Sequence, residues 1–135
     1  EVADAAGIKV TAHAHSAESI KDAILAGVSS IEHASLGDDE SVALAVKHNV
    51  AFSMDVYNGT YTEEVGTEQG YAAEFMQKNT DTTEAQRIVF EKALAAGVTI
   101  LFGTDLGVLP HDLGARQFEV MVERGVFDGG QTHGR

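Results

Sequence analysis

The stretch KVTAHAHSAESIKDAILAGVSSIEHASL, Lys9–Leu36, holds two copies of one pattern. In each copy a short apolar run with β-branched residues ends in a histidine, His13 in the first and His33 in the second. Between them, Ser16 can cap a helix whose apolar residues recur on one face. A strand, a helix and a second strand in this order predict two parallel strands joined by a right-handed crossover.

The pattern recurs twice more along the chain, each time after a Gly or Asn that can end a helix in left-handed conformation. The four expected strands are residues 8–12, 28–32, 50–54 and 98–102, and they are followed by His13, His33, Asp55 and Asp105. We expect helices to begin at Ser16, at Asp38 or Asp39 and at Thr82 or Thr83, with a last helix over Ala115–Glu123. The polar segment Tyr57–Gly70 is expected to be a loop above the strand ends, either a lid that contacts substrate or an insertion without a role.

This alternation predicts an α/β fold of parallel β/α repeats. Two architectures fit it, an open doubly wound sheet and about half of a TIM-type (β/α)₈ barrel. In both, ligand sites lie at the C-terminal ends of the strands, where the His and Asp residues fall. No G-x-G-x-x-G loop follows any expected strand, which weakens the case for a nucleotide-binding open sheet.

Composition excludes several classes of partner. The formal charge of −12 argues against nucleic acid and against anionic membranes as binding partners. No apolar run is long enough to cross a bilayer, and we expect a cytoplasmic location. The chain has no cysteine, so a metal site would have to use histidines and carboxylates.

Three residues form the candidate metal site. His13, His33 and Asp105 each follow an expected strand, and the ends of parallel strands meet at one edge of a sheet. Imidazole and carboxylate ligands together suit zinc, manganese, iron or cobalt better than calcium. A metal so held activates water and polarises a carbonyl, and a neighbouring Asp can transfer the proton.

The Lys9–Leu36 stretch and a later one, GVTILFGTDLGVLPH at Gly97–His111, together resemble the amidohydrolase superfamily. The resemblance is to its imidazolonepropionase-like members and to its Xaa-Pro and Xaa-Arg dipeptidase group, and it covers Ala3–Gly125. It implies a barrel of which this chain supplies strands five to eight, about half of the roughly 250 residues of a full barrel. It also implies a divalent metal, with zinc expected first, and hydrolysis of an amide or peptide bond in a small amide or dipeptide.

The resemblance assigns roles residue by residue. His13 matches the strand-five metal ligand and His33 the strand-six ligand. Asp105 matches the strand-eight aspartate, which contacts the metal or its water and is the general base. Tyr57 and His111 are the candidate substrate-binding residues, although this chain has PHDLG where related dipeptidases often carry PHG.

Two further polar residues share the pattern but are not expected to bind the metal. His15 faces the same side of its strand as His13 and is expected to line the pocket or to cap the following helix. Asp55 has no ligand counterpart in the family, so we expect it to cap a helix or to form a hydrogen bond within a loop.

Some family features have no match in this chain, namely the first-strand H-x-H pair and the fourth-strand lysine that bridges two metals. Half a barrel leaves strand edges unpaired, so we expect a homo-oligomer that covers them. The alternative function is a non-catalytic half-barrel fragment or oligomerising module without a complete metal site. We take residues 1–125 as the partial barrel domain and residues 126–135 as a divergent C-terminal tail.

Overall fold

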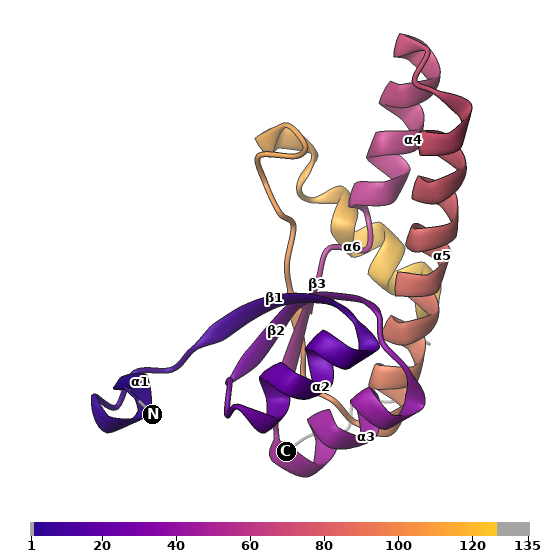
Figure 1. Ribbon diagram of the computed structural model, residues 1–135. Helices are drawn as coiled ribbons and strands as arrows, with labels where there is room; N and C mark the ends of the chain where they lie inside the picture. Colours follow the sequence, from indigo (N-terminus) through magenta and orange to yellow (C-terminus); the bar gives the residue numbers. More distant parts are fainter. Residues whose placement is uncertain (1, 127–135) are drawn as a thin grey trace.

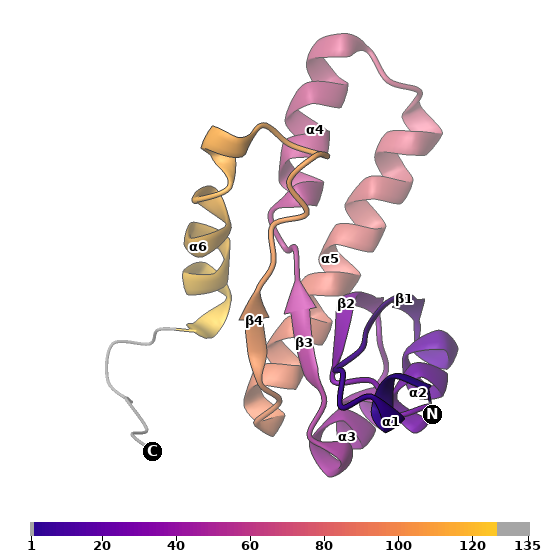
Figure 2. The same cartoon turned by 90° about the vertical axis from the view of Figure 1, so that its left-hand side faces the viewer.

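The computed structural model describes residues 2–126 of the 135-residue chain. Four strands form one parallel sheet in the order β1-β2-β3-β4 (Figure 2). Their bounds are Thr11–Ser16 (β1), Ser30–Leu36 (β2), Ala51–Met54 (β3) and Ile100–Phe102 (β4). Right-handed crossovers between strands in this order all run over the same face of the sheet. The opposite face therefore receives no helix from the connections.

Helices fill each connection between the strands (Figure 1). They are α2 (Ala17–Leu25), α3 (Asp39–His48), α4 (Asn58–Gln69) and α5 (Ala73–Ala96), while α1 (Val2–Ala5) precedes β1 and α6 (Arg116–Met121) follows β4. A 3₁₀ turn, η1 (His111–Leu113), precedes α6, and a π-helical segment, η2 (Val122–Val126), follows it. Helices α4 and α5 form a long antiparallel pair that extends beyond the sheet.

The hydrophobic core lies between the sheet and helices α2, α3 and α5. Its members include buried side chains from β2 and β3 and from all three helices, among them Ile20, Ile24, Ile31, Val42, Ala45, Phe52, Met54, Val89, Phe90 and Ala93. The other face of the sheet, which we call the open face, carries side chains that the strand register aligns: His13, Glu32, Ser53 and Leu101. Of these, His13 and Leu101 at the two edges are exposed to solvent.

Local sequence signals explain where helices α2 and α3 begin. Ser16 is the N-cap of α2 and its hydroxyl accepts a hydrogen bond from the Ser19 N–H at 3.1 Å. Asp38 forms a capping box with Ser41 at the start of α3, and Asn49 ends that helix in left-handed conformation with φ of 54°. These helix starts are where the sequence predicts them.

The strands and the later helices differ from the expectation in three ways. Strands β1 and β2 begin two or three residues later than expected, so His13 and His33 lie within strands and do not follow them. Helix α5 begins at Ala73 and not at Thr82 or Thr83. The last helix is shorter at both ends, because a π-helical segment replaces the regular pattern from Val122.

The segment Tyr57–Gly70 is not a loop. It forms helix α4, which packs against α5. The carbonyl of Gly59 accepts a hydrogen bond from Asn79 Nδ2 at 2.9 Å, and Arg87 donates to both Val56 O and Thr60 Oγ1. The prediction of a loop was wrong because it relied on local composition, whereas contacts with α5 stabilise the helix.

The expected C-terminal tail, residues 126–135, falls almost entirely outside the described residues. Among residues 2–126, no helix is both long and apolar enough to cross a membrane.

Candidate metal centre

His33 is turned away from the direction that the strand register predicts. It pairs with Ala14, whose side chain is buried on the helix-covered face, and paired residues of parallel strands point to the same side. Yet the His33 ring lies against the rings of His13 and His15, with centroid distances of 4.8 and 4.5 Å. The cause is a register irregularity in β1–β2 together with φ of 74° at His33, which re-aims the side chain as a bulge does.

Two hydrogen-bond contacts occupy the two nitrogens of the His33 ring. Its Nε2 lies 2.7 Å from His13 Nδ1, and its Nδ1 lies 3.0 Å from Asp55 Oδ1. An ionised carboxylate only accepts, so His33 Nδ1 carries a hydrogen and donates it to Asp55. The Nε2 atom is consequently the one that faces His13.

Charge and burial shift the pKa values of this group. The hydrogen bond with Asp55 raises the pKa of His33 above its usual range. Burial alone would raise the pKa of Asp55, but hydrogen bonds from His33 and Gln86 and the charge of His33 outweigh it, so this pKa lies below its usual range. Burial, followed by the nearby His33, lowers the pKa of His15. The carboxylate therefore stays ionised beside the histidines at neutral pH.

Asp105 joins this group from the loop after β4. Asn58 Nδ2, at the start of α4, donates to Asp55 Oδ2 at 2.9 Å and lies 3.4 Å from Asp105 Oδ2. Gly103, two residues before Asp105, lies close against β3, where a Cβ would be 2.5 Å from Ser53 Oγ. The backbone of Asp105 is itself left-handed, with φ of 49°.

The donor atoms are close enough to share one cation. One ligand atom from each of His33, Asp55 and Asp105 lies within 4.8 Å of the other two. His13 contacts this group through His33. The two imidazole nitrogens 2.7 Å apart share a hydrogen bond. Nitrogen and carboxylate donors of this kind suit a transition metal. In addition, the buried Oδ1 of Asn58 has no hydrogen-bond partner. The residues present thus fit a divalent metal.

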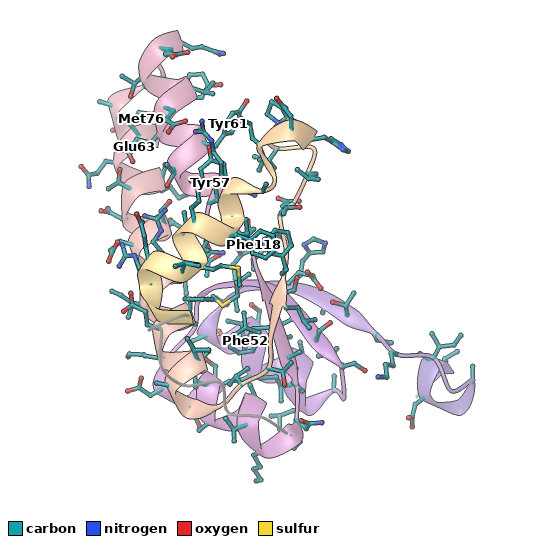
Figure 3. The ribbon with its side chains drawn as sticks, turned by 180° about the vertical axis from the view of Figure 1, so that it is seen from behind. Phe52, Tyr57, Tyr61, Glu63, Met76 and Phe118 are labelled. Atoms are coloured by element: carbon teal, nitrogen blue, oxygen red, sulfur yellow. The ribbon has the colours of Figure 1, made fainter. Side chains whose placement is uncertain are left out.

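The structure places two of the predicted metal residues, His33 and Asp105, in one group with Asp55, and His13 contacts that group through His33. The two candidate substrate residues lie elsewhere. Tyr57 is 4% exposed between α4 and α6, and its hydroxyl lies 3.3 Å from Arg116 Nη1 (Figure 3). His111 is exposed in η1. His15 stacks on His33 and lies 3.1 Å from Ser35 Oγ, whereas the cap of α2 is Ser16. For Tyr57 and His111, substrate binding stays a prediction.

Sequence reasoning missed three residues of the centre. Asp55 was expected to form a hydrogen bond, which it does, but not to join the donor group. Its position after the third strand, equivalent to that of Asp105, was the available signal. Asn58 and Gln86 had no such signal, because one lies in the segment expected to be a loop and the other in the middle of a long helix.

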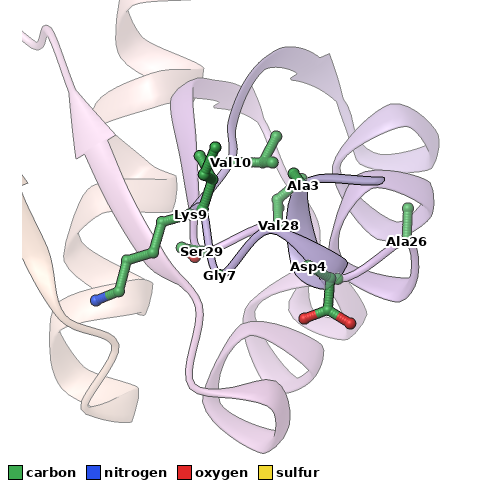
Figure 4. Close-up of a pocket in the computed structure, with 10 residues that line it drawn as sticks. Ala3, Asp4, Gly7, Lys9, Val10, Ala26, Val28 and Ser29 are labelled. Atoms are coloured by element: carbon green, nitrogen blue, oxygen red, sulfur yellow. The ribbon is translucent and has the colours of Figure 1, made fainter. Parts of the chain in front are cut away.

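A hollow lies at the N-terminal end of the strands, opposite the candidate metal centre (Figure 4). It is bordered by α1 and by the segments that lead into β1 and β2. Its lining residues include two charged side chains, Asp4 and Lys9, and no histidine. It therefore lacks the donor set found at the other end of the sheet.

Comparisons with known proteins identify the family and the fold. Residues 1–128 match the Amidohydrolase family. A search of curated proteins gave no match. Among solved structures, a Xaa-Pro dipeptidase with methionine bound in its active site is 35% identical, with a TM-score of 0.80, over 91% of this chain and 30% of that one.

Two other solved structures are similar. A prolidase in complex with N-methylphosphonate-L-proline is 29% identical with a TM-score of 0.74, over 90% of this chain and 30% of that one. The A. niger ochratoxinase is 29% identical with a TM-score of 0.70, over 87% of this chain and 26% of that one. The chain thus spans less than a third of the length of each of these structures.

These matches confirm both the resemblance and the fold class predicted from the sequence. Proteins of this family generally bind divalent metals, which agrees with the His and Asp donors found at the strand ends. The four parallel strands and their helices correspond to part of the family's TIM-barrel-like fold. This chain belongs to the amidohydrolase family.

Proposed function

We propose that this chain supplies part of the active site of a metal-dependent hydrolase that cleaves an amide or peptide bond in a dipeptide or another small amide, with zinc as the metal. The family match and the similarity to a Xaa-Pro dipeptidase and a prolidase support this reaction class.

The observation that carries the proposal is the position of the strained backbone residues. Four residues other than glycine have positive φ in the described chain, and three of them, His33, Ala34 and Asp105, lie at the candidate metal centre. The fourth, Asn49, ends a helix in the ordinary way. Strained backbone persists where the surrounding structure enforces it, and it clusters at functional sites. Here the strain directs two donor side chains toward one another.

The proposed roles follow from the contacts. His13, His33 and Asp105 would hold the metal. When bound, a divalent metal activates a water molecule and polarises the carbonyl of the scissile bond. Asp105 is exposed, so its carboxylate can accept the proton of that water and return it to the leaving amine.

Tyr57 and His111 remain the proposed substrate contacts. The Tyr57 hydroxyl is buried beside the half-exposed guanidinium of Arg116. A substrate carboxylate that binds Arg116 would also come within reach of this hydroxyl. His111 lies in the loop after Asp105, on the exposed side of η1.

A second candidate function, an oligomerising half-barrel module, is favoured by the sheet edges. Within residues 2–126, β1 and β4 each pair with a strand on one side only. Leu101 and Phe102 in β4 are 41% and 44% exposed, and unpaired edges of this kind associate readily.

Dipeptide hydrolysis by the purified chain tests the proposal. We expect turnover of Xaa-Pro dipeptides after addition of Zn²⁺ or Mn²⁺, its loss on addition of a chelator, and its loss in His13→Ala. The matched control is His48→Ala, which removes an exposed imidazole from the last turn of α3 and should leave turnover unchanged.

Turnover that survives the chelator, or equal rates in wild type and His13→Ala, would contradict the proposal. Light scattering on the same samples gives the mass of the assembly. A larger assembly without metal-dependent turnover would support the second candidate function.

A further inference from the structure

We propose that Asp55 is a positioning residue of the metal centre, which orients His33 without binding the metal, and that Gln86 and Asn58 hold Asp55 in place. This inference rests on the proposed function, because it assigns roles around the same metal.

The oxygens of Asp55 are already engaged by three N–H donors. Oδ1 accepts from His33 Nδ1 at 3.0 Å and from Gln86 Nε2 at 2.7 Å, and Oδ2 accepts from Asn58 Nδ2 at 2.9 Å. The residue is only 9% exposed. Three of the about four acceptor sites of the carboxylate are occupied, including both on Oδ1, the oxygen that faces His33. The contacts thus favour a carboxylate that accepts hydrogen bonds over one that coordinates.

The hydrogen bond to Asp55 selects one tautomer of His33. With the hydrogen on Nδ1, the lone pair of a neutral ring is on Nε2, the atom that faces His13 Nδ1. A histidine that binds a metal commonly donates its other N–H to a carboxylate, which fixes the ring and increases its basicity. Asp55 occupies that position relative to His33.

Gln86 forms hydrogen bonds with both members of the His33–Asp55 pair. Its Nε2 donates to Asp55 Oδ1 at 2.7 Å and to the carbonyl oxygen of His33 at 3.2 Å. Gln86 is 6% exposed and lies in the middle of α5, the longest helix. One amide therefore connects the carboxylate to the strained backbone of the histidine that it orients, and connects both to a rigid element.

Asn58 links the pair to the expected general base. Its Nδ2 lies between Asp55 Oδ2 and Asp105 Oδ2, at 2.9 and 3.4 Å. An N–H donor shared by two carboxylates offsets part of the electrostatic repulsion between them. The start of α4 thus determines how far Asp105 stands from the His33–Asp55 pair.

Two measurements on the full chain test this inference. The first is Zn²⁺ affinity by calorimetry, together with the absorption spectrum of bound Co²⁺. We expect Asp55→Asn to weaken Zn²⁺ binding by about 10- to 100-fold while the Co²⁺ spectrum at saturation stays unchanged, since the ligands are the same. We expect a smaller loss, about threefold to tenfold, in Gln86→Leu, where the contact between His33 and Asp55 remains. The matched control is Asp39→Asn, an exposed aspartate on α3, which should bind Zn²⁺ as wild type does.

The second measurement needs no metal. Long-range ¹H–¹⁵N NMR at pH 8 should show wild-type His33 with its hydrogen on Nδ1, and Asp55→Ala should lose that preference. Wild-type His33 with its hydrogen on Nε2 would overturn the proposal, even if the variants failed to fold.

The two proposals fail in different ways. If wild type bound no Zn²⁺, the proposed function would fail. The NMR measurement of the His33 tautomer would then be the remaining test of whether Asp55 orients His33. If wild type bound Zn²⁺ but Asp55→Asn changed the Co²⁺ spectrum, Asp55 would be a ligand and the positioning role would be wrong. Unchanged affinity in Asp55→Asn would also overturn it.

Discussion

Helices α3 and α4 have similar lengths but are stabilised by different interactions. Helix α3 begins with a capping box, has Asp39 and Glu40 in its first turn and Lys47 and His48 in its last, and ends at a left-handed Asn49. Each of these features stabilises a helix locally. Helix α4 has no side-chain cap and no acidic residue in its first turn, and it contains two glycines and three threonines. By its own sequence it would be a poor helix.

Contacts with α5 supply what α4 lacks. Arg87 donates to Val56 O and to Thr60 Oγ1, and Asn79 donates to Gly59 O. The comparison teaches that one helix is determined by its sequence and the other by its docking. It also concerns the site, because α4 begins at Asn58, the residue between the two carboxylates.

The largest expected effect is on the docked helix. A Cβ on Gly59 would lie 2.6 Å from Thr83 Cβ in α5, so Gly59→Ala should separate the two helices. We expect the free energy of unfolding to fall by about 2 to 3 kcal/mol, as for an overpacked core site. Urea denaturation followed by circular dichroism measures it.

Gly66→Ala is the matched control within the same helix. A Cβ there would meet the sulfur of Met76 and would lie 2.9 Å from Cδ2 of Tyr71. The Met76 side chain is flexible and Tyr71 is 42% exposed, so both can move. Alanine also has the better helix propensity, by about 1 kcal/mol. Gly66→Ala should therefore change stability much less than Gly59→Ala. Equal losses would show that docking does not decide the stability of α4.

A smaller effect is expected at the start of α3. Asp38 Oδ1 accepts a hydrogen bond from the Ser41 N–H at 2.7 Å. Loss of an N-cap of this kind costs about 1 kcal/mol, so Asp38→Ala should reduce the free energy of unfolding by about that amount at pH 7. Asp38→Asn, which keeps an accepting oxygen, should lose less.

This difference should depend on pH. The backbone N–H of Ser41, followed by Lys21, lowers the pKa of Asp38 below its usual range. A carboxyl whose folded-state pKa is lowered stabilises the protein above its unfolded-state pKa, which is about 3.9 for Asp. The gap between wild type and Asp38→Ala should be largest above about pH 5 and should shrink as the pH falls through the folded-state value. A gap that widened in acid would contradict this account.

The smallest effect is expected for the ion pair that joins α3 to α5. Lys92 Nζ lies 2.6 Å from Asp39 Oδ1, but the two side chains are 49% and 84% exposed. Exposed pairs of this kind contribute about 0.2 to 1 kcal/mol. A double-mutant cycle with Lys92→Met and Asp39→Asn should give a coupling at the low end of that range, and smaller still in 0.5 M salt. A coupling above 1 kcal/mol would mean that this contact matters to the docking of α5.

The sequence predicts more of the fold than of the site. The parallel β/α order and the caps of α2 and α3 follow from periodicity and from single residues such as Ser16 and Asp38. The residue types of the metal centre, two histidines and an aspartate after apolar runs, are visible as well. Its outer members are not, because Asn58 and Gln86 become neighbours of Asp55 only when α4 and α5 return to the sheet.

The sequence by itself determined the order of the strands and helices and the caps of α2 and α3, because short-range signals specify strands, caps and turns. Only the tertiary structure decided the direction of His33. Register alone would place its ring in the core beside Ala14, and the positive φ of His33 and the irregular pairing of β1 and β2 turn it to the open face. Such a turn is stable only when distant residues, here Asp55 and Gln86, satisfy the groups that it places there.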